Sequence, residues 1–241
     1  MLALDRLLQR QGFGTRKACG AMIAAGQVCV RVAGDDAFRV CTDPGARFAP
    51  GGLRFTVDGE PWRYRERVYI ALNKPAGYEC STQPRHHPSV LSLLPPPMIN
   101  RGVQCVGRLD QDTTGLLLLS DDGDFIHALT SPKKHVPKVY EATTKHPLDD
   151  EQLAALAAGV VLRDAPKPVL ACDCRRLDRH LLQLTIAEGR YHQVKRMVAA
   201  AGNRVEALHR VTIGRYVLPA SLAPGRWTWL EEGELALLRS A

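Results

Sequence analysis

The sequence has no long apolar run, no Cys-x-x-Cys pair and few aromatic residues, which make up 6% of the chain. No stretch approaches the roughly 20 apolar residues that a membrane helix needs, so we expect no membrane span. The seven cysteines are an odd number and are scattered, apart from Cys172 and Cys174. Those two lack the partners of a zinc knuckle. Reduced thiols are therefore the simpler interpretation, with neither a metal site nor a disulfide framework.

The first ten residues already carry Asp5, Arg6 and Arg10, so they do not resemble the apolar core of a signal peptide. Together with the scattered thiols, this predicts a cytoplasmic protein with no membrane partner. Hydrophobic residues at 45% and charged residues at 24% are ordinary for a globular chain. The length of 241 residues is enough for one small and one medium domain.

Basic residues outnumber acidic ones, with 32 Lys and Arg against 25 Asp and Glu and a net charge of +7. Residues 1–65 hold ten basic and six acidic residues, so about a quarter of the chain carries over half of the excess. A basic balance suits a polyanionic partner such as nucleic acid. A solvated basic surface would give the same composition, so charge alone does not decide between them.

The N-terminal part is predicted to be a small module of helices and strands. Residues 4–11 have the i, i+3, i+4 leucine stripe of an amphipathic helix. Thr15 can cap a second helix that runs to residue 25, with Ala18 on its inward face. Residues 28–32 alternate valine with other residues, which predicts a strand. Residues 33–62 are rich in glycine, proline and aspartate and are expected to be irregular, with short strands.

The rest of the chain is predicted to be a separate α+β domain. Four consecutive leucines, Leu116–Leu119, are bounded by turn residues and predict a strand that is buried on both faces. Asp149 can cap a helix that Gly159 ends. Strands and helices interleave without a regular βαβ rhythm, which favours a mixed sheet. We therefore expect a small α/β domain over residues 1–65 and a mixed-sheet domain over residues 66–241. The other expected elements are strands over 69–72, 139–144 and 182–186 and helices over 124–129 and 192–201.

Two segments carry side chains that are suited to chemistry. Gly107-Arg108-Leu109-Asp110 places a carboxylate where a strand meets a loop, and Asp112, Asp121 and Asp122 follow closely. A structural turn, a metal site and a pair of glycosidase carboxylates all stay open for this acidic stretch. Residues 188–196 contain a glycine and several basic residues and lead into a helix. Such a segment can bind an anion, but it is equally typical of a solvated basic surface.

Taken together, four segments resemble the motifs of the ribosomal-RNA pseudouridine synthases, in that family's order. The run from Gly107 to Gly123 resembles the catalytic motif, and Asn73-Lys74-Pro75-Ala76-Gly77 resembles the first motif. Lys138-Val139-Tyr140 resembles the segment with an active-site tyrosine, and Glu188–Met197 resembles the segment that supplies a cation. The amino-acid sequences of these motifs are most similar to those of the small-subunit branch, the RsuA type. The N-terminal module resembles the RNA-binding domain first seen in ribosomal protein S-four.

The resemblance implies an enzyme that breaks the N1–C1′ bond of a uridine, turns the uracil and rejoins it through C5, without metal or cofactor. It assigns the reacting carboxylate to Asp110 and the stacking platform to Tyr140. Lys195 is the implied cation that offsets the cost of burying the ionised carboxylate. Whether Asp110 attacks C1′ or removes a C2′ proton stays open. The implied substrate-binding residues are Arg108, His192, Gln193, Arg196 and Lys74, and the implied RNA-binding residues are Arg6, Arg10, Arg16, Lys17 and Arg31.

The expected substrate is one uridine of 16S small-subunit ribosomal RNA, at the 516-type site, free or in a partly assembled particle. The protein is expected to act as a monomer. One alternative is a pseudouridine synthase that acts on 23S ribosomal RNA. A second is a non-catalytic RNA-binding protein of ribosome assembly, against which the intact Asp110, Tyr140 and Lys195 argue. A third is a glycosidase, but Asp110 and Asp112 would point apart on an extended chain.

Overall fold

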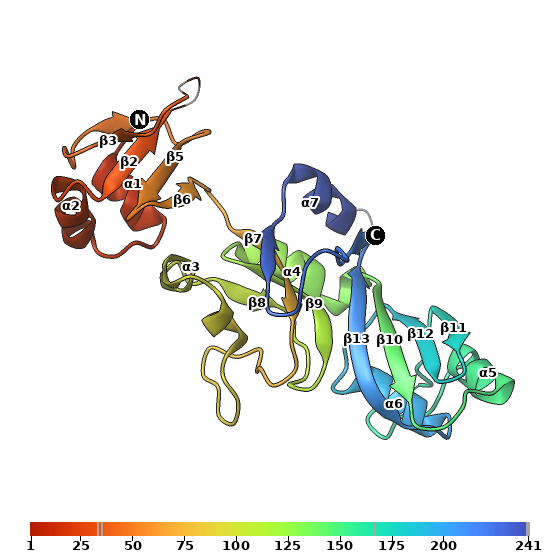
Figure 1. Cartoon of the computed structure of the whole chain (residues 1–241). Coiled ribbons are helices and arrows are strands. Elements are labelled where there is room, and N and C mark those ends of the chain that lie inside the picture. The colour runs from red at the N-terminus through yellow and green to blue at the C-terminus, as the bar shows by residue number, and fades with distance from the viewer. Residues whose placement is uncertain (33, 35, 166, 240–241) are drawn as a thin grey trace. The chain divides into compact units, whose positions relative to one another are not determined.

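The computed structural model describes every residue except Ala33, Asp35, Pro166, Ser240 and Ala241. The chain divides into two compact units, each built from two stretches of sequence (Figure 1). The first unit contains Met1–Val68 and Leu94–Val103, and the second contains Tyr69–Leu93 and the chain from Gln104 onward. The irregular region expected from residue 33 falls partly outside the described residues.

The first unit places two helices and a four-stranded sheet around one core. The sheet order is β3-β2-β5-β6, and β1 pairs separately with β4. Leucines of the first helix, Cys19 and Ile23 of the second, and valines and Phe55 of the sheet form this core. The elements are β1 (Leu2–Ala3), α1 (Leu4–Arg10), α2 (Arg16–Ala24), β2 (Val28–Arg31), β3 (Arg39–Val40), β4 (Arg47–Phe48), β5 (Arg54–Val57), β6 (Glu60–Arg63) and α3 (Pro96–Asn100).

The helices of this unit begin and end close to where the sequence predicts. Thr15 caps α2, because its side chain accepts a hydrogen bond from the N–H of Ala18. The expectation that Ala18 faces inward is wrong, since it is exposed and the neighbouring Cys19 is fully buried instead. A shift of one position rotates the helix face by about 100°. The cysteine thus fills the core as a small apolar residue.

The stretch Leu94–Val103, expected to be loop, contains α3 and belongs to the first unit. Proline at the start of a helix is compatible with this, because the first turn needs no N–H donor. Asn100 donates to the carbonyl oxygen of Gly12 at 2.8 Å. Gly12 has a φ of +87°, and a Cβ there would lie 1.9 Å from the carbonyl oxygen of Pro97. Glycine is therefore required for this close packing.

The second unit is built on a mixed nine-stranded sheet. Its main path runs β11-β12-β10-β13-β9-β7-β15, with β14 beside β13 and β8 beside β9 (Figure 1). β9 and β13 pair in parallel, whereas the other named neighbours in this sheet are antiparallel. The strands are β7 (Tyr69–Lys74), β8 (Gln104–Val106), β9 (Thr114–Ser120), β10 (Lys138–Thr144), β11 (Asp173–Asp178), β12 (Leu181–Ile186), β13 (Val205–Ile213), β14 (Tyr216–Val217) and β15 (Trp227–Trp229). The helices are η1 (Val90–Leu93), α4 (Gly123–Thr130), η2 (Pro132–Lys134), α5 (Asp150–Ala158), α6 (Gln193–Ala200) and α7 (Glu232–Arg239).

The leucine run forms the centre of this sheet, as predicted. Leu116–Leu119 are all fully buried in β9, between β7 and β13. One core cluster joins the sheet to α4 and α7 through Leu116, Leu118, Phe125, Leu129, Leu235 and Leu238. The mixed-sheet α+β architecture expected from the sequence is confirmed. Among the described residues, no helix is long and apolar enough to span a bilayer.

Candidate active site

The loop that carries Asp110 joins β8 to β9 and is held by a buried lysine. The Nζ atom of Lys74 donates to the carbonyl oxygens of Asp110 at 3.1 Å, Gln111 at 3.2 Å and Thr113 at 2.9 Å, and to that of Pro75 at 3.1 Å. Lys74 is fully buried. Its burial lowers its pKa, an effect that nearby Cys80, Asp112 and Asp110 oppose. The ammonium thus fixes the backbone on both sides of the carboxylate.

Two more contacts attach this loop to the segment after β7. The N–H of Gly77 donates to the carbonyl oxygen of Gln111 at 2.8 Å, and the N–H of Leu109 donates to Sγ of Cys80 at 3.4 Å. A hydrogen bond with Cys105 and the one from Leu109 lower the pKa of Cys80 to about 6, although burial opposes this. The residues that precede and follow Asp110 are therefore both fixed by the same segment.

The carboxylate of Asp110 lies between two potential cations. Nε2 of His192 is 3.3 Å from Oδ1, and Nζ of Lys195 is 3.4 Å from Oδ2. Lys195 is closer to Asp112, at 2.7 and 2.9 Å. Although partial burial raises the pKa of Asp112, the hydrogen bond and charge of Lys195 lower it below its usual range. The two carboxylates therefore converge on one ammonium. The expectation that they point apart is wrong, because residues two apart lie on the same face even of an extended chain.

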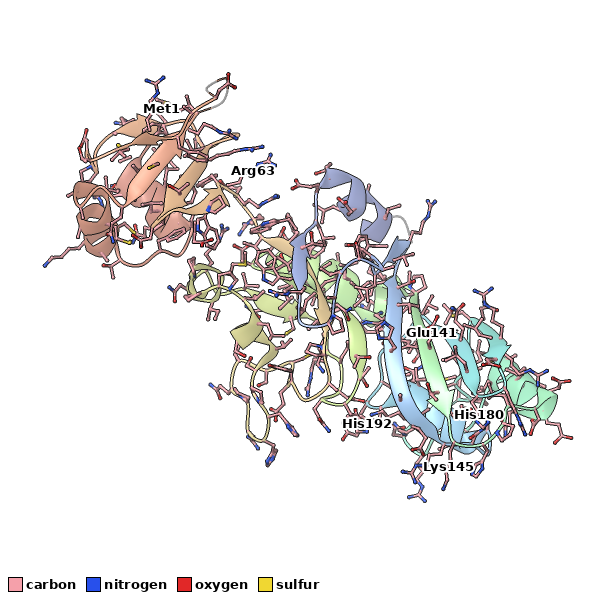
Figure 2. All side chains as sticks on the ribbon, viewed as in Figure 1. Met1, Arg63, Glu141, Lys145, His180 and His192 are labelled. Atoms are coloured by element: carbon pink, nitrogen blue, oxygen red, sulfur yellow. The ribbon has the colours of Figure 1, made fainter. Side chains whose placement is uncertain are left out.

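His192, labelled in Figure 2, immediately precedes α6. Its backbone is left-handed, with φ 49° and ψ 34°. This conformation is unfavourable for a residue with a Cβ and is found at functional sites more often than elsewhere. The imidazole stacks on the ring of Tyr191, with centroids 3.8 Å apart. The conformation directs the ring of His192 toward Asp110 while the helix carries Lys195 one turn further on.

The opposite wall of the site comes from the centre of the sheet. Tyr140 on β10 is mostly buried, and its hydroxyl accepts a hydrogen bond from Nη1 of Arg210 on β13 at 3.3 Å. Nε of Arg210 donates to the carbonyl oxygen of Leu116 at 2.8 Å. Nη2 of Arg210 has no hydrogen-bond partner among the described residues. Lys138, two residues before Tyr140 and so on the same face of β10, lies beside this charge.

These side chains surround a cavity of about 510 Å³. This volume lies within the range of roughly 300–1,000 Å³ that is typical of small-molecule sites. The charged and polar lining residues include Arg108, Asp110, Lys138, Tyr140, His192 and Arg210. Glu188 also lines the cavity, but its carboxylate pairs with Arg190 at 2.7 Å. The apolar lining includes Val106, Leu109, Leu129, Ile186, Val194 and Leu208. A cavity with this mixture of carboxylate, cations and apolar side chains suits an uncharged base attached to a phosphodiester chain.

The comparison with known proteins agrees with this chemistry. A family model described as RNA pseudouridylate synthase matches residues 68–200, more than half of the chain. The chain belongs to this family. It is therefore a pseudouridine synthase, an isomerase, and the resemblance drawn from the four motifs is confirmed.

Relatives and a solved structure extend the similarity over the whole pseudouridine synthase. It is 38% identical to Ribosomal small subunit pseudouridine synthase A of Escherichia coli (strain K12), over 98% of this chain and 99% of that protein. It is 39% identical to the Uncharacterized RNA pseudouridine synthase YtzG of Bacillus subtilis (strain 168), over 98% of both chains. A crystal structure of a pseudouridylate synthase superposes with a TM-score of 0.68 at 35% identity, covering 99% of this chain and 100% of that one.

Not every residue expected to bind substrate lines the cavity of this pseudouridine synthase. Lys74 is buried behind the loop and binds backbone carbonyls instead. Arg196 points away and pairs with Asp164. Gln193 borders the cavity but is buried, and its side chain accepts from the N–H of Arg190. These three expectations came from matching motifs, and a motif does not separate a residue that touches substrate from one that positions it.

Several cavity residues were absent from the expected set, among them Lys138 and Arg210. Lys138 belongs to the Lys-x-Tyr motif, and the period of a strand could have placed it on the same face as Tyr140. Arg210 gave no local signal, because it is an isolated arginine in a strand that was not predicted. The remaining acids of the stretch are structural in part: Asp122 caps α4 and accepts a hydrogen bond from Tyr69.

Proposed function

We propose that this pseudouridine synthase modifies a uridine of 16S small-subunit ribosomal RNA, at the 516-type site, with Asp110 as its reacting carboxylate. The observation that carries the substrate is the full-length similarity to enzymes named Ribosomal small subunit pseudouridine synthase A. An enzyme of this kind works where ribosomal subunits assemble, so we place it in the cytoplasm, acting as a monomer on RNA or on a partly assembled particle. We also propose residues 1–65 as the core of its RNA-binding domain.

The geometry supports a reaction in five steps. The target uridine leaves its stack and enters the cavity, because its reacting bonds are inaccessible inside an RNA helix. Tyr140 replaces the lost stacking, and Arg108 and His192 contact the nucleotide. Asp110 then acts at the sugar, and the N1–C1′ bond breaks. The detached uracil turns within the closed cavity, where confinement keeps C5 close to C1′ and favours recombination over escape. The C5–C1′ bond then forms, C5 loses its proton and N1 takes up a proton, which completes the isomerisation.

The substrate is tested by incubating the enzyme with transcripts of 16S and 23S ribosomal RNA and mapping pseudouridine by carbodiimide-dependent primer stops. We expect one stop in the 16S transcript and none in the 23S transcript. A stop only in 23S RNA would support the alternative substrate. If neither RNA is modified, including within partly assembled particles, the proposed ribosomal substrate is wrong.

Lys195 provides the first prediction, since its ammonium faces both carboxylates. Lys195→Met should lower the single-turnover rate by roughly 10²-fold or more, as expected for loss of a preorganised charge. Lys195→Arg should keep the rate within about tenfold, because the charge is retained. A Lys195→Met rate equal to that of the wild type would refute this role.

The lowered pKa of Lys138 leads us to expect that the enzyme takes up a proton when it binds RNA. Burial and the charge of Arg210 lower its pKa to about 8, so the free enzyme loses this proton in mildly alkaline buffer. A phosphate in the cavity should raise that pKa, because it stabilises the ammonium, and binding at about pH 9 should then take up protons. Calorimetry in two buffers of different ionisation enthalpy measures the uptake. Lys138→Met should abolish it, and Lys145→Met, which alters an exposed lysine, should not.

The RNA-binding role of the first unit gives a third prediction. Arg6 and Lys17 are exposed on α1 and α2, whereas Arg16 is engaged by Asp5 at 2.5 Å. Arg6→Ala/Lys17→Ala should weaken RNA binding and lower the log–log salt slope by about 0.7–0.9 for each phosphate that loses its cation. Arg63→Ala, on the edge strand β6 of the same unit, is the control (Figure 2). An unchanged salt slope in the double variant would show that Arg6 and Lys17 do not contact RNA phosphates and are only part of the solvated surface.

A further inference from the structure

The loop of residues 81–88, which follows β7, is an exposed and well-defined projection of the second unit. Every residue from Thr82 to Pro88 is exposed, so none of their side chains contributes to the core. The loop closes at its base, where the N–H of Glu79 donates to the carbonyl oxygen of Pro88 at 3.0 Å and the N–H of Val90 donates to that of Glu79 at 2.9 Å. We call residues 81–88 the Arg85 loop.

Glu79 organises the tip of the Arg85 loop. Its carboxylate accepts hydrogen bonds from three successive backbone N–H groups, those of Arg85 at 3.1 Å and of His86 and His87 at 2.9 Å. The hydrogen bonds from His86, Arg85 and His87 lower the pKa of Glu79, so the carboxylate stays ionised. Because the three N–H groups turn inward to one acceptor, the three side chains are presented outward.

The Arg85 loop stands on the loop that carries Asp110. Cys80, immediately before it, accepts from the N–H of Leu109, and Gly77 donates to the carbonyl oxygen of Gln111. Arg85 is five residues from Cys80, so a fully extended chain would place it no more than about 18 Å away. Because Leu109 and Asp110 line the cavity, a span of about 18 Å from Cys80 puts Arg85 within reach of nucleotides next to one bound in the cavity.

The side chains at the tip of the loop are better suited to bind RNA than to bind another protein. An arginine guanidinium binds phosphate through a planar fork and stacks on bases, and imidazole rings also stack on bases. Pro84 and Pro88 restrict the backbone, so less conformational freedom is lost on binding. Because the loop buries no apolar side chain, its fixed conformation does not stabilise the hydrophobic core. The conformation does hold the side chains of Arg85, His86 and His87 in position to contact a partner.

We propose that the Arg85 loop is a second RNA contact, which binds the backbone and bases of the nucleotides next to the flipped uridine. This inference rests on the proposed function, since it takes the entering substrate to be ribosomal RNA. The contact holds the strand outside the cavity and so should contribute to substrate affinity. It should not contribute to the bond-breaking step, because no side chain of the loop lines the cavity.

The test compares Arg85→Ala/His86→Ala/His87→Ala with the wild type on 16S transcripts. In single-turnover reactions, we expect the half-saturating concentration to rise about tenfold, as for the removal of one phosphate interaction together with base stacking. The rate at saturation should stay within about threefold. The log–log salt slope of binding should fall by about 0.7 for each phosphate of a single strand that the variant no longer neutralises. Arg215→Ala/His127→Ala, which alters exposed residues elsewhere in the same unit, should change none of these.

A second variant, Glu79→Gln, keeps all three outward side chains but weakens the acceptor that organises them. It should raise the half-saturating concentration in the same direction, by less than the triple variant. Wild-type affinity and salt slope in the triple variant would overturn the proposal, and so would a loss confined to the saturated rate, which would make the loop a support for Asp110. If the wild type modifies no ribosomal RNA, the proposed function fails separately, because binding and the salt slope are measured without turnover.

Discussion

Asp110→Asn is expected to abolish pseudouridine formation, with a loss on the order of 10⁴-fold or more, as for removal of an essential catalytic group. The amide has nearly the shape of the carboxylate, but it can neither attack the sugar nor remove a proton. The backbone contacts from Lys74, Gly77 and Cys80 do not involve this side chain, so the loop should keep its conformation. The variant should therefore fold normally and bind RNA with wild-type affinity.

The measurement is single-turnover conversion of a 16S transcript, with carbodiimide mapping of the product. Asp112→Asn is the matched control, because Asp112 shares Lys195 with Asp110 but is more exposed, at 56% of its side chain against 29%. We expect the control to remain active, since removing Asp112 leaves Lys195 free to pair with Asp110. If Asp110→Asn turns over within about tenfold of the wild type, Asp110 is not the reacting group.

Lys74→Met is expected to destabilise the second unit by about 3–5 kcal/mol, the usual cost of removing one partner from a buried charged contact. Methionine fills a similar volume but removes one donor from four carbonyl oxygens. Those of Asp110 and Gln111 keep hydrogen bonds from the N–H groups of Thr113 and Gly77. Loss of hydrogen bonds to a buried charged donor is costly, and the mutual repulsion of the carbonyl oxygens should loosen the Asp110 loop. A chain of this size should lose roughly 10 °C or more in Tm.

Thermal unfolding followed by circular dichroism measures the stability, and turnover at a temperature well below the transition measures the site. We expect turnover of the folded Lys74→Met protein to be low as well, because the position of Asp110 depends on this ammonium. Lys145→Met removes an exposed lysine and should change Tm by no more than about 1–2 °C. A Lys74→Met protein with wild-type Tm and turnover would show that the four hydrogen bonds are dispensable.

Local patterns predicted the elements whose causes are local. The leucines of β9 are apolar on both faces, which indicates a central strand without knowledge of its neighbours. Thr15 and Asp149 identify helix starts, since a capping hydrogen bond joins residues only three apart. The buried stripe of α6 was likewise predicted, with Val194, Met197 and Val198 inside and Lys195 off the stripe.

The features that the sequence did not predict depend on contacts between distant segments. Lys74 is separated from Thr113 by 39 residues, and nothing in its own neighbourhood distinguishes a buried lysine from a substrate-binding one. Arg210 meets Tyr140 across 70 residues, and the adjoining strand β13 was not assigned. Leu94–Val103 joined the first unit through contacts with residues near 12 and 65 that no periodicity reveals.

The parallel pairing of β9 with β13 brings together two segments of the cavity that lie far apart in the chain. It joins Thr114 to His209 and Gly115 to Arg210, and a Cβ at Gly115 would lie 2.3 Å from the carbonyl oxygen of Arg210. The two strands are 95 residues apart in the chain at Thr114 and His209. Such a pair forms only after a long closure, and such closures are slow. The wall of the cavity that bears Arg210 therefore forms only after the chain up to β13 is available to pair with β9, so the cavity should be completed late in folding.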